Sequence, residues 1–514
     1  MLQYIMAVAR SIQRLGETFA DLALKYIPDP YVLVIGLTVL AFVGALAAGA
    51  GVQGILDAWF GGLWSFLEIM AQFSIILMTG DAIAKSPTVT RLLKRIASFP
   101  DSQASAVAFV VVVSMFAALI SWGLGLIVGA VIARQVAYQG KQRDLKLHYP
   151  LLAAAGYTGL MIWHSGLTTS SGLIMATPSS LPQSFQQYTP SGIPLSQTIG
   201  STVNLVTVVL LLLVIPPIMA ALHPDSDSDI RELPERLAER MSASSESGSE
   251  SGTGEGVAAD GGTESTDREA ASADSEAEAI DEPVEAGHQD PAEPGLNERE
   301  SVADRLNRSV ILTILIAIFP AYYVVNAWIL EGQGITSLSL NSINAFFLLF
   351  AIVLWRTPIG VVEQMEESVE NVAGIIFQFP FYAGISGILT ATALGAAIAD
   401  AFASVATPLT WPVLGLISAG IVNVFVPSGG GQWLAQGPIL LETTQQLGMP
   451  LYTAVVIEMM GDQLTNMIQP FWALPLLALT NLRARDIIGY STVAMVAAFV
   501  VMAITMTLFL GVGV

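Results

Sequence analysis

Five ionisable side chains stand inside long apolar stretches of this chain: Glu68, Asp81, His164, Glu458 and Asp462. Titratable groups at membrane depth are costly, so such residues are functional candidates by default. Asp462 belongs to a polar run, and Glu458 precedes it by one helical turn. His164 is the only histidine in an apolar stretch, and it opens the hydroxyl-rich run HSGLTTSS. Carboxylates and a histidine in this setting indicate binding of a cation or a proton.

Four interruptions break the apolar stretches that hold these residues. They are SWGLG at 121–125 and HSGLTTSS at 164–171 in the first half, and PSGGGQW at 427–433 and DQLTNMIQP at 462–470 in the second. Non-helical backbone at membrane depth survives only where it is buried in protein or lines a cavity. Three consecutive glycines are poor helix formers, so an open loop is predicted there. The run at 121–125, taken alone, fits close helix packing equally well.

Each break frees backbone N–H groups at the start of a half-helix, and such donors suit a carboxylate. Serine and threonine hydroxyls add neutral donors. The predicted substrate-binding residues flank the breaks: Ser121, Trp122, Gly123, Gly125, Ser165, Gly166, Thr168, Thr169, Ser428, Gly429, Gly430, Gly431, Gln432, Gln469 and Pro470.

The predicted ion-coupling residues are His164, Asp462, Thr465 and Asn466. Asp462, with carbonyls freed around Thr465 and Asn466, offers hard oxygen ligands that suit Na⁺ as a coupling ion. His164 offers a site that can hold a proton near neutral pH. No other cofactor is expected, and we favour Na⁺ over H⁺ because the first repeat also offers hydroxyl oxygens.

Apolar helices must position these groups. Of 514 residues, 53% are hydrophobic and 12% are charged, and the mean hydropathy is +0.63. That is too little charge for a soluble surface. Predicted spans and half-spans lie at 31–50, 64–84, 105–120 with 126–139, 150–176, 197–222, 309–330, 341–356, 373–390, 409–427 with 433–441, 451–479 and 486–510.

Basic residues set the predicted topology. The pair at 105–139 has lysines and arginines on both flanks, so a re-entrant hairpin keeps both groups on one side, as the positive-inside rule requires. Nine spans and two hairpins then place every Lys and Arg, the N-terminus and the linker on the cytoplasmic side. The two halves correspond in order and run in opposite directions. We therefore expect an all-α polytopic membrane protein of two inverted-topology repeats, each with a re-entrant helical hairpin and a broken transmembrane helix.

Composition divides the chain into five parts. An amphipathic segment (1–30) precedes the first membrane repeat (31–222), and a connecting transmembrane helix (303–340) precedes the second repeat (341–514). Between them, an acidic linker is predicted at 223–302. Its residues 223–300 hold 23 Asp and Glu against 5 Arg in low-complexity sequence, which predicts a disordered cytoplasmic tether. The chain has no cysteine, which excludes disulfides and thiolate chemistry.

Several motifs, in this order, resemble the short-chain fatty acid (acetoacetate) transporter family: IPDP at 27–30, WGLGLIVGAVIAR at 122–134, QFPFYAGI at 378–385, VPSGGG at 426–431 and QPFWALP at 469–475. The resemblance covers nearly the whole chain outside the linker. It implies transport of short monocarboxylates such as acetate, butyrate or acetoacetate, driven by Na⁺ or H⁺, within a superfamily of paired hairpins that are often dimeric. The sequence departs from the family pattern at His164–Gly166, where glycines are expected, and at Asp462, where Glu is expected.

The resulting hypothesis is a cation-coupled secondary transporter of short-chain monocarboxylates, working by alternating access in the cytoplasmic membrane. A di- or tricarboxylate carrier is the alternative in the same class, although no Lys or Arg lies in a span to neutralise a second carboxylate. A membrane-embedded enzyme or a channel is the alternative of another class; no catalytic motif supports an enzyme. The expected partners are a small carboxylate, membrane lipid and, left open, a second copy of the chain. No nucleic acid is expected.

Overall fold

The computed structural model describes residues 25, 30–65, 67–224, 226–239, 241, 301–330, 339–426 and 428–512. The predicted amphipathic segment lies almost entirely outside the described residues, as do linker residues 242–300, Pro427 and the last two residues. Every regular element within the described ranges is helical. The prediction of an all-α membrane protein is therefore confirmed at that level.

The first half of the chain contains, in order, α2 (Pro30–Ala47), α3 (Val52–Leu63), α4 (Leu67–Lys85), α5 (Pro87–Ile96), α6 (Gln103–Ile120), α7 (Trp122–Gln142), α8 (Tyr149–Tyr157), η1 (Thr158–Met161), η2 (Trp163–Ser165), α9 (Ser170–Met175), η3 (Pro178–Ser180), α10 (Gln183–Gln186), η4 (Leu195–Gln197), α11 (Thr202–Ala220) and η5 (Asp227–Asp229).

The second half contains α13 (Val302–Asn307), α14 (Val310–Val325), η6 (Asn326–Leu330), α15 (Leu340–Trp355), α16 (Pro358–Ser368), η8 (Val369–Val372), α17 (Ala373–Ala391), α18 (Ala393–Val405), α19 (Trp411–Phe425), α20 (Gly429–Gln446), α21 (Tyr452–Thr465), η9 (Asn466–Ile468), α22 (Pro470–Thr480), α23 (Ala484–Met506) and η10 (Thr507–Gly511).

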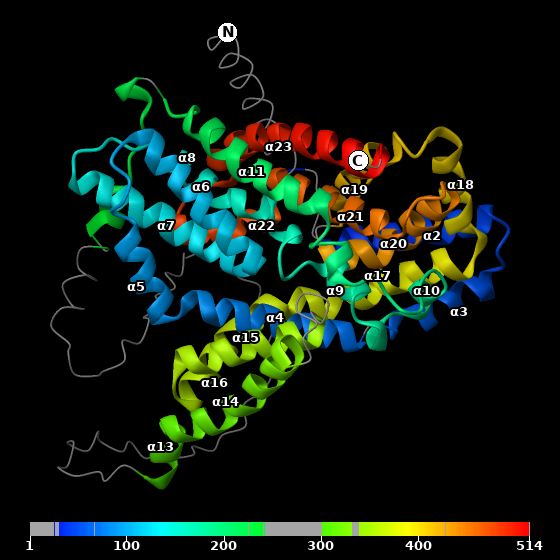
Figure 1. Cartoon of the computed structure of the whole chain (residues 1–514), viewed down its shortest axis with the longest axis horizontal. Helices are drawn as coiled ribbons and strands as arrows, with labels where there is room; N and C mark the ends of the chain where they lie inside the picture. The colour runs from blue at the N-terminus through cyan, green and yellow to red at the C-terminus, as the bar shows by residue number, and fades with distance from the viewer. Residues whose placement is uncertain are drawn as a thin grey trace, which may run out of the picture. The chain divides into compact units, whose positions relative to one another are not determined.

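Within the membrane body the helices pack in three groups (Figure 1). Helices α6, α7 and α8 pack on one another, and α11 and α23 pack against them. Helices α2, α3, α18 and α20 gather around α17, while α14 and α16 flank α4 and α15. Helix α21 lies among α19, α20 and α9 and also touches η2, so it joins segments from both halves of the chain.

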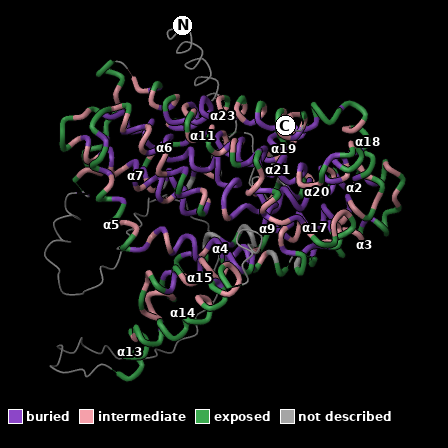
Figure 2. The backbone as a smooth tube through the Cα atoms, viewed as in Figure 1, coloured by how far each residue is buried: buried purple, intermediate pink, exposed green. Residues whose placement is uncertain are grey.

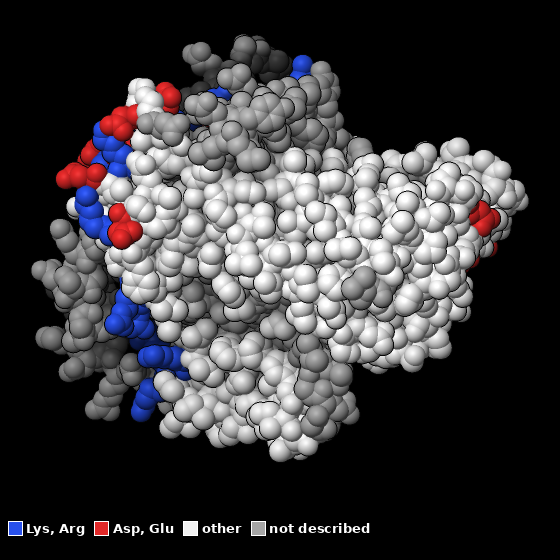
Figure 3. Space-filling model, turned by 45° about the horizontal axis from the view of Figure 1, so that its top comes forward, with Lys and Arg blue, Asp and Glu red and all other residues white. Residues whose placement is uncertain are grey.

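Surface and burial agree with a bilayer environment. Buried backbone concentrates in the centre of the body, and the outer helices turn apolar side chains outward (Figure 2). The face in Figure 3 carries a broad area without charge, bordered by basic and acidic side chains at one end and by acidic ones at the other. Because apolar surface on this scale is not stable in water, the chain is a membrane protein.

Four helical stretches in the described part are long and apolar enough to cross a membrane alone: Gln103–Ile120, Thr202–Ala220, Val310–Leu330 and Ala484–Gly511. Three of these were predicted as spans, whereas residues 105–120 were predicted as one arm of a re-entrant hairpin. The other six predicted spans are shorter, broken or more polar helices. The predicted span 373–390 continues instead into α18 through a bend of 76°. Sequence inspection missed helices α3, α16 and α18 because each is short and carries acidic residues or glycines.

The predicted linker begins too early. Residues up to Pro234 belong to the compact membrane body, and the body resumes at Asn307. The segment after α11 is held to the body by ion pairs that join Lys146 Nζ to Asp227 Oδ2 at 2.6 Å and Arg231 Nη1 to Asp486 Oδ1 at 2.7 Å. Composition did not indicate this attachment, because the acidic bias starts before the docked residues end.

Candidate functional site

In the first broken span the helix is interrupted at Gly166, where the chain lies close to the end of α6. Helix α8 ends at Tyr157, two 3₁₀ turns follow, and α9 starts only at Ser170. A Cβ atom on Gly166 would overlap the carbonyl oxygen of Leu119, at the end of α6. The N–H of Leu167 donates to that same oxygen at 2.8 Å. Gly166, a predicted substrate-binding residue, is therefore placed for backbone contact with the first hairpin.

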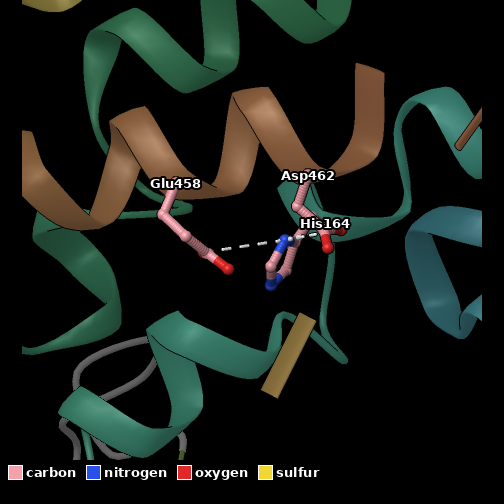
Figure 4. Close-up of side chains that lie close together, drawn as sticks. All are labelled: His164, Glu458 and Asp462. Carbon is pink, nitrogen blue, oxygen red and sulfur yellow. Dashed lines mark ion pairs between the residues drawn. The ribbon is translucent and has the colours of Figure 1, made fainter. Parts of the chain in front are cut away.

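His164, Glu458 and Asp462 come together in the interior (Figure 4). Glu458 and Asp462 lie one turn apart on α21, so both point toward the imidazole that η2 presents. The Nδ1 atom of His164 lies 3.4 Å from Asp462 Oδ1 and 3.9 Å from Glu458 Oε2. The three side chains are 0%, 0% and 1% exposed, in the order His164, Glu458, Asp462.

The rest of the imidazole is fixed by backbone and by an aromatic ring. Its Nε2 accepts a hydrogen bond of 3.4 Å from the backbone N–H of Ser171. The ring stacks on Trp163, with centroids 4.2 Å apart and planes 5° apart. Stacking and the Ser171 bond together turn Nδ1 toward the two carboxylates.

Several buried polar atoms around this cluster have no hydrogen-bond partner among the described residues. They include His164 Nδ1, both carboxylate oxygens of Glu458, Asp462 Oδ1 and the hydroxyls of Thr168 and Thr169. The Ser171 hydroxyl lies beside Glu458 without reaching hydrogen-bond geometry. An unpartnered buried polar atom costs about 1–3 kcal/mol, so a group of them marks a place built to bind something.

Ser165 and Gln463 connect the two broken spans. The N–H of Ser165 donates to Gln463 Oε1 at 3.1 Å, and Gln463 Nε2 donates to Ser165 Oγ at 3.0 Å. The amide of Asn204 on α11 donates to the carbonyl of Ser165 at 3.1 Å. Ser165, predicted to bind substrate, is thus tied into the structure on three sides.

The second hairpin tip lies against the first broken span. Ser428 caps α20, and its Oγ accepts from the N–H of Gly431 at 3.2 Å. A Cβ on Gly429 would lie 2.9 Å from the Trp163 ring and 3.1 Å from His164 Cε1. A Cβ on Gly430 would lie 3.0 Å from Phe379, and one on Gly431 would lie 2.6 Å from Tyr382. Glycine is needed here because aromatic rings leave no room for side chains.

The non-helical segments at the two hairpin tips contain fewer residues than the sequence predicted. In the second hairpin, Gly429–Trp433 form the first turn of α20, so the glycines are helical. In the first hairpin only Ser121 leaves the helix, while Trp122, Gly123 and Gly125 belong to α7. Intrahelical hydrogen bonds and capping outweigh the poor helix propensity of glycine at these ends.

The first hairpin contacts the first broken span through η2 and through the Leu167 N–H, which donates to the Leu119 carbonyl. A Cβ on Gly125 would lie 2.5 Å from the Ala118 side chain, so this glycine serves packing within the hairpin. Ser121 Oγ faces Gly80 of α4, and the Trp122 ring packs edge-on against Trp472 at 5.1 Å. Against the α20 tip the structure places Trp163, His164 and Ser170 of the first broken span. Thr168 and Thr169 directly precede Ser170 in the chain, and their buried hydroxyls have no hydrogen-bond partner among the described residues.

Three further predicted site residues, Thr465, Asn466 and Gln469, form hydrogen bonds with Asn423 or Tyr157. Asn423 on α19 donates from Nδ2 to the Asp462 carbonyl at 2.8 Å, to Thr465 Oγ1 at 3.0 Å and to Asn466 Oδ1 at 2.8 Å. The Tyr157 hydroxyl donates to the carbonyls of Asn466 and Gln469, at 2.7 and 2.9 Å. These bonds use the oxygens predicted to bind Na⁺, while the carboxylate of Asp462 turns to His164 instead. The Na⁺ site at Asp462, Thr465 and Asn466 stays a prediction.

The two remaining acids of the apolar stretches lie elsewhere, both on α4. Asp81 Oδ2 accepts from the Ser368 hydroxyl at 2.6 Å and pairs with Lys85 Nζ at 2.9 Å. Glu68 accepts from Gln72 at 3.4 Å. Pro470 only starts α22, and the amide of Gln432 donates to the Ala419 carbonyl at 2.9 Å.

Sequence inspection overlooked the amides that hold the breaks in place. Asn204 and Asn423 each stand alone in an otherwise apolar helix, and Gln463 sits beside Asp462 without having been singled out. A lone amide in a span was the available signal, because a polar group at membrane depth requires a partner. Which partner it takes depends on contacts between distant segments.

A helical membrane body whose broken helices meet at a buried polar cluster is typical of membrane transporters. The chain belongs to the short-chain fatty acid transporter family: the family model described as "Short chain fatty acid transporter" matches residues 11–252 and 270–509. Members of this family are transporters and not enzymes.

Two relatives agree with this assignment, and a solved structure is similar in fold. A candidate short-chain fatty acid transporter of Escherichia coli K12 is 32% identical, over 97% of this chain and 100% of its own length. One from Haemophilus influenzae Rd is 29% identical, over 94% and 97%. The crystal structure of the Alcanivorax borkumensis YdaH transporter is similar in fold, with a TM-score of 0.54, 14% identity, and coverage of 94% of this chain and 98% of that one.

Proposed function

We propose that this protein is a cation-coupled secondary transporter that carries short-chain monocarboxylates across the cytoplasmic membrane by alternating access. The observation that carries the proposal is the packing of the α20 tip against Trp163 and His164 of the first broken span, a segment that also holds the buried, unpartnered hydroxyls of Thr168 and Thr169. Family membership supports transport, and the chemistry of this meeting point supports a small anion.

The carboxylate of the substrate would bind at the start of α20. The first N–H groups of a helix have no partner within it, and Ser428 accepts only from Gly431 and Gln432. The N–H groups of Gly429 and Gly430, with the positive end of an 18-residue helix, suit one carboxylate. Thr168 and Thr169 supply hydroxyl donors from the opposite side.

The size of the substrate would be set by aromatic rings. Trp163, Phe379 and Tyr382 lie against the three glycines of the tip, so an acyl chain bound at the tip would have to fit between these rings. In the described residues no Lys or Arg forms an ion pair with the site, so a second carboxylate would remain uncompensated. This favours monocarboxylates over di- or tricarboxylates.

Alternating access would use two inverted repeats. Hairpin α6–α7, broken span α8–α9 and closing helix α11 correspond in order to hairpin α19–α20, broken span α21–α22 and closing helix α23. We place the N-terminus and the linker in the cytoplasm, because that arrangement puts all basic residues on one side.

Uptake by purified protein in liposomes tests the proposal. Labelled acetate, butyrate, acetoacetate and succinate are supplied outside vesicles preloaded with the same unlabelled acid, and protein-free vesicles are subtracted because undissociated short acids cross lipid unaided. We expect exchange of the monocarboxylates and none of succinate. Absence of protein-dependent exchange for every monocarboxylate would reject the proposed function.

A further inference from the structure

We propose that the coupling ion is a proton carried by the Glu458–Asp462 pair, and that His164 remains neutral and acts as a donor to that pair. This inference rests on the proposed function and names its coupling ion. The pair and the imidazole are fully buried, and both carboxylates point at His164 Nδ1 (Figure 4). Sequence reasoning had assigned the proton to His164 and Na⁺ to Asp462.

The hydrogen bond on the far side of the ring assigns the tautomer of His164. Because the Ser171 N–H donates to Nε2, that nitrogen must offer its lone pair. A neutral imidazole then carries its proton on Nδ1, where it faces Asp462 and Glu458. Adding a second proton would place an N–H at Nε2 directly opposite the Ser171 N–H. We therefore take His164 as the neutral tautomer whose Nδ1–H faces the two acids.

Two neighbouring carboxylates in a buried site cannot both be ionised at reasonable cost without a cation. No other ionisable group of the elements packed on α21 and η2 reaches them. On those elements the ionisable side chains are Glu442 at the end of α20, Arg485, Asp486 and Tyr490 at the start of α23, and Arg134, Tyr138 and Lys141 on the later part of α7. Asp486 pairs with Arg231, and Tyr490 bonds to His148. A proton shared by Glu458 and Asp462 supplies the missing compensation.

The position of the cluster explains coupling. His164 lies against Gly429, at the helix start proposed to bind the substrate carboxylate. With both acids ionised, the anionic substrate would face two negative charges across a medium of low polarity. Protonating one acid removes part of that repulsion, so proton and substrate favour each other's binding.

The transport step balances without any other reactant. A proton from the outer solution forms an O–H bond with one carboxylate of the pair, and the substrate anion binds at the α20 tip. After the site turns to the cytoplasm, the O–H bond breaks and both ions leave. One H⁺ and one RCOO⁻ cross together, so the cycle moves no net charge.

Substrate binding to purified protein in detergent tests this without interference from acid that crosses lipid. In Na⁺-free, weakly buffered solution with a pH indicator, the wild type should take up about one proton per bound butyrate above the pH at which the pair ionises, and its affinity should fall there about tenfold per pH unit. Below that pH the pair already holds its proton, so binding should take up none. Glu458→Gln mimics the protonated acid, so it should bind butyrate without proton uptake and with a flat pH profile. Glu442→Gln, at the far end of α20, should behave like the wild type.

Infrared spectroscopy gives an independent measurement. At neutral pH the wild type should show a protonated carboxyl band that Glu458→Gln or Asp462→Asn removes, whether or not butyrate binds. Affinity that rises with Na⁺ and ignores pH, or proton uptake that persists in Glu458→Gln, would overturn the proton assignment. If no monocarboxylate binds while the carboxyl band is present, the proposed substrate fails and the shared proton stands. Absence of the band in the wild type would refute the shared proton.

Discussion

The two broken helices follow one plan but differ in how their polar groups are satisfied. The first break, from Thr158 to Thr169, presents His164, Thr168 and Thr169 with buried atoms that have no partner. The second break, from Asn466 to Gln469, is held by Asn423 and Tyr157, which bond its carbonyls and side chains. Its two acids stand on the intact helix α21 before the break.

This difference separates a binding role from a structural one. Unpartnered donors lower stability and are retained where a ligand supplies the partner. Satisfied donors rigidify the backbone that carries the acids. We infer that the first break binds the substrate and that the second positions the acids, although the predicted inverted repeats make the two breaks look equivalent. Four predictions follow this contrast, from the largest expected effect to the smallest.

Asn423→Ala should destabilise the protein strongly. Its amide satisfies three acceptors of the second broken span, and leaving them unpaired in the interior should lower the free energy of unfolding by about 2–4 kcal/mol. Thermal unfolding in detergent measures this. Thr443→Ala, which removes a buried hydroxyl that bonds only the Ile439 carbonyl of its own helix, is the matched control and should cost far less. Equal losses for both variants would contradict a positioning role for Asn423.

Thr168→Val combined with Thr169→Val should show the opposite pattern. The hydroxyls have no protein partner, so removing them should leave the melting temperature unchanged or raise it. Exchange of butyrate in liposomes should fall at least about tenfold, which corresponds to about 1.4 kcal/mol of lost binding. Thr453→Val removes another unpartnered buried hydroxyl, outside the site, and should leave exchange intact. Normal exchange by the double variant would remove the first break from the substrate site.

Gln463→Leu should affect both butyrate binding and stability, because it removes the hydrogen bonds that join Ser165 in the first break to α21. Ser165 would lose its partners for both the N–H and the hydroxyl. We expect a several-fold loss of butyrate affinity, about 1 kcal/mol, with a similar loss of stability. Binding and unfolding are measured on the same preparation, with exposed Gln446→Leu as the control. A large loss of affinity without any loss of stability would place Gln463 in direct contact with substrate.

His148, at the start of α8 and outside both breaks, should make the stability of the protein depend on pH. Burial and the nearby His223 and Arg231 lower the pKa of His148 from 6.5 to about 4. Both of its ring nitrogens have partners: the Arg231 N–H donates to Nδ1, and the Tyr490 hydroxyl contacts Nε2. Because the unfolded chain binds the proton more tightly, stability is complete above pH 6.5 and falls as the pH is lowered toward 4.

Between pH 6.5 and about pH 5.5 the expected loss is about 1 kcal/mol, the smallest effect of the four. It is measured as the pH dependence of thermal unfolding. His148→Asn should flatten this part of the profile and leave the pH dependence of butyrate affinity unchanged. If His148→Asn altered the affinity profile instead, His148 and not the Glu458–Asp462 pair would report the coupling proton.

Much of the architecture was predictable from the sequence. Apolar length, charge placement and interrupted spans are local properties, so they predicted an all-helical membrane protein and the segments that break. The family was indicated separately, by the resemblance of motifs such as VPSGGG and QPFWALP. The same reasoning singled out His164 and Asp462, because an ionisable residue in an apolar run is visible without knowledge of its neighbours. It missed helices α3, α16 and α18, whose short polar sequences gain their stability from tertiary packing.

The partners of the polar residues were decided only in three dimensions. Asp462 carries its carboxylate toward His164, nearly 300 residues earlier, while its own neighbours Thr465 and Asn466 turn to Asn423. Sequence adjacency favoured a Na⁺ site among neighbours, but η2 and α19, which pack on α21, give these residues different partners. The composition of this chain determines that polar groups are buried in a membrane. The packing of α19, α20 and η2 around α21 determines which buried polar groups form hydrogen bonds within the protein and which can bind a ligand. The reason is that a buried donor can bond only to an acceptor that the fold places within hydrogen-bond distance.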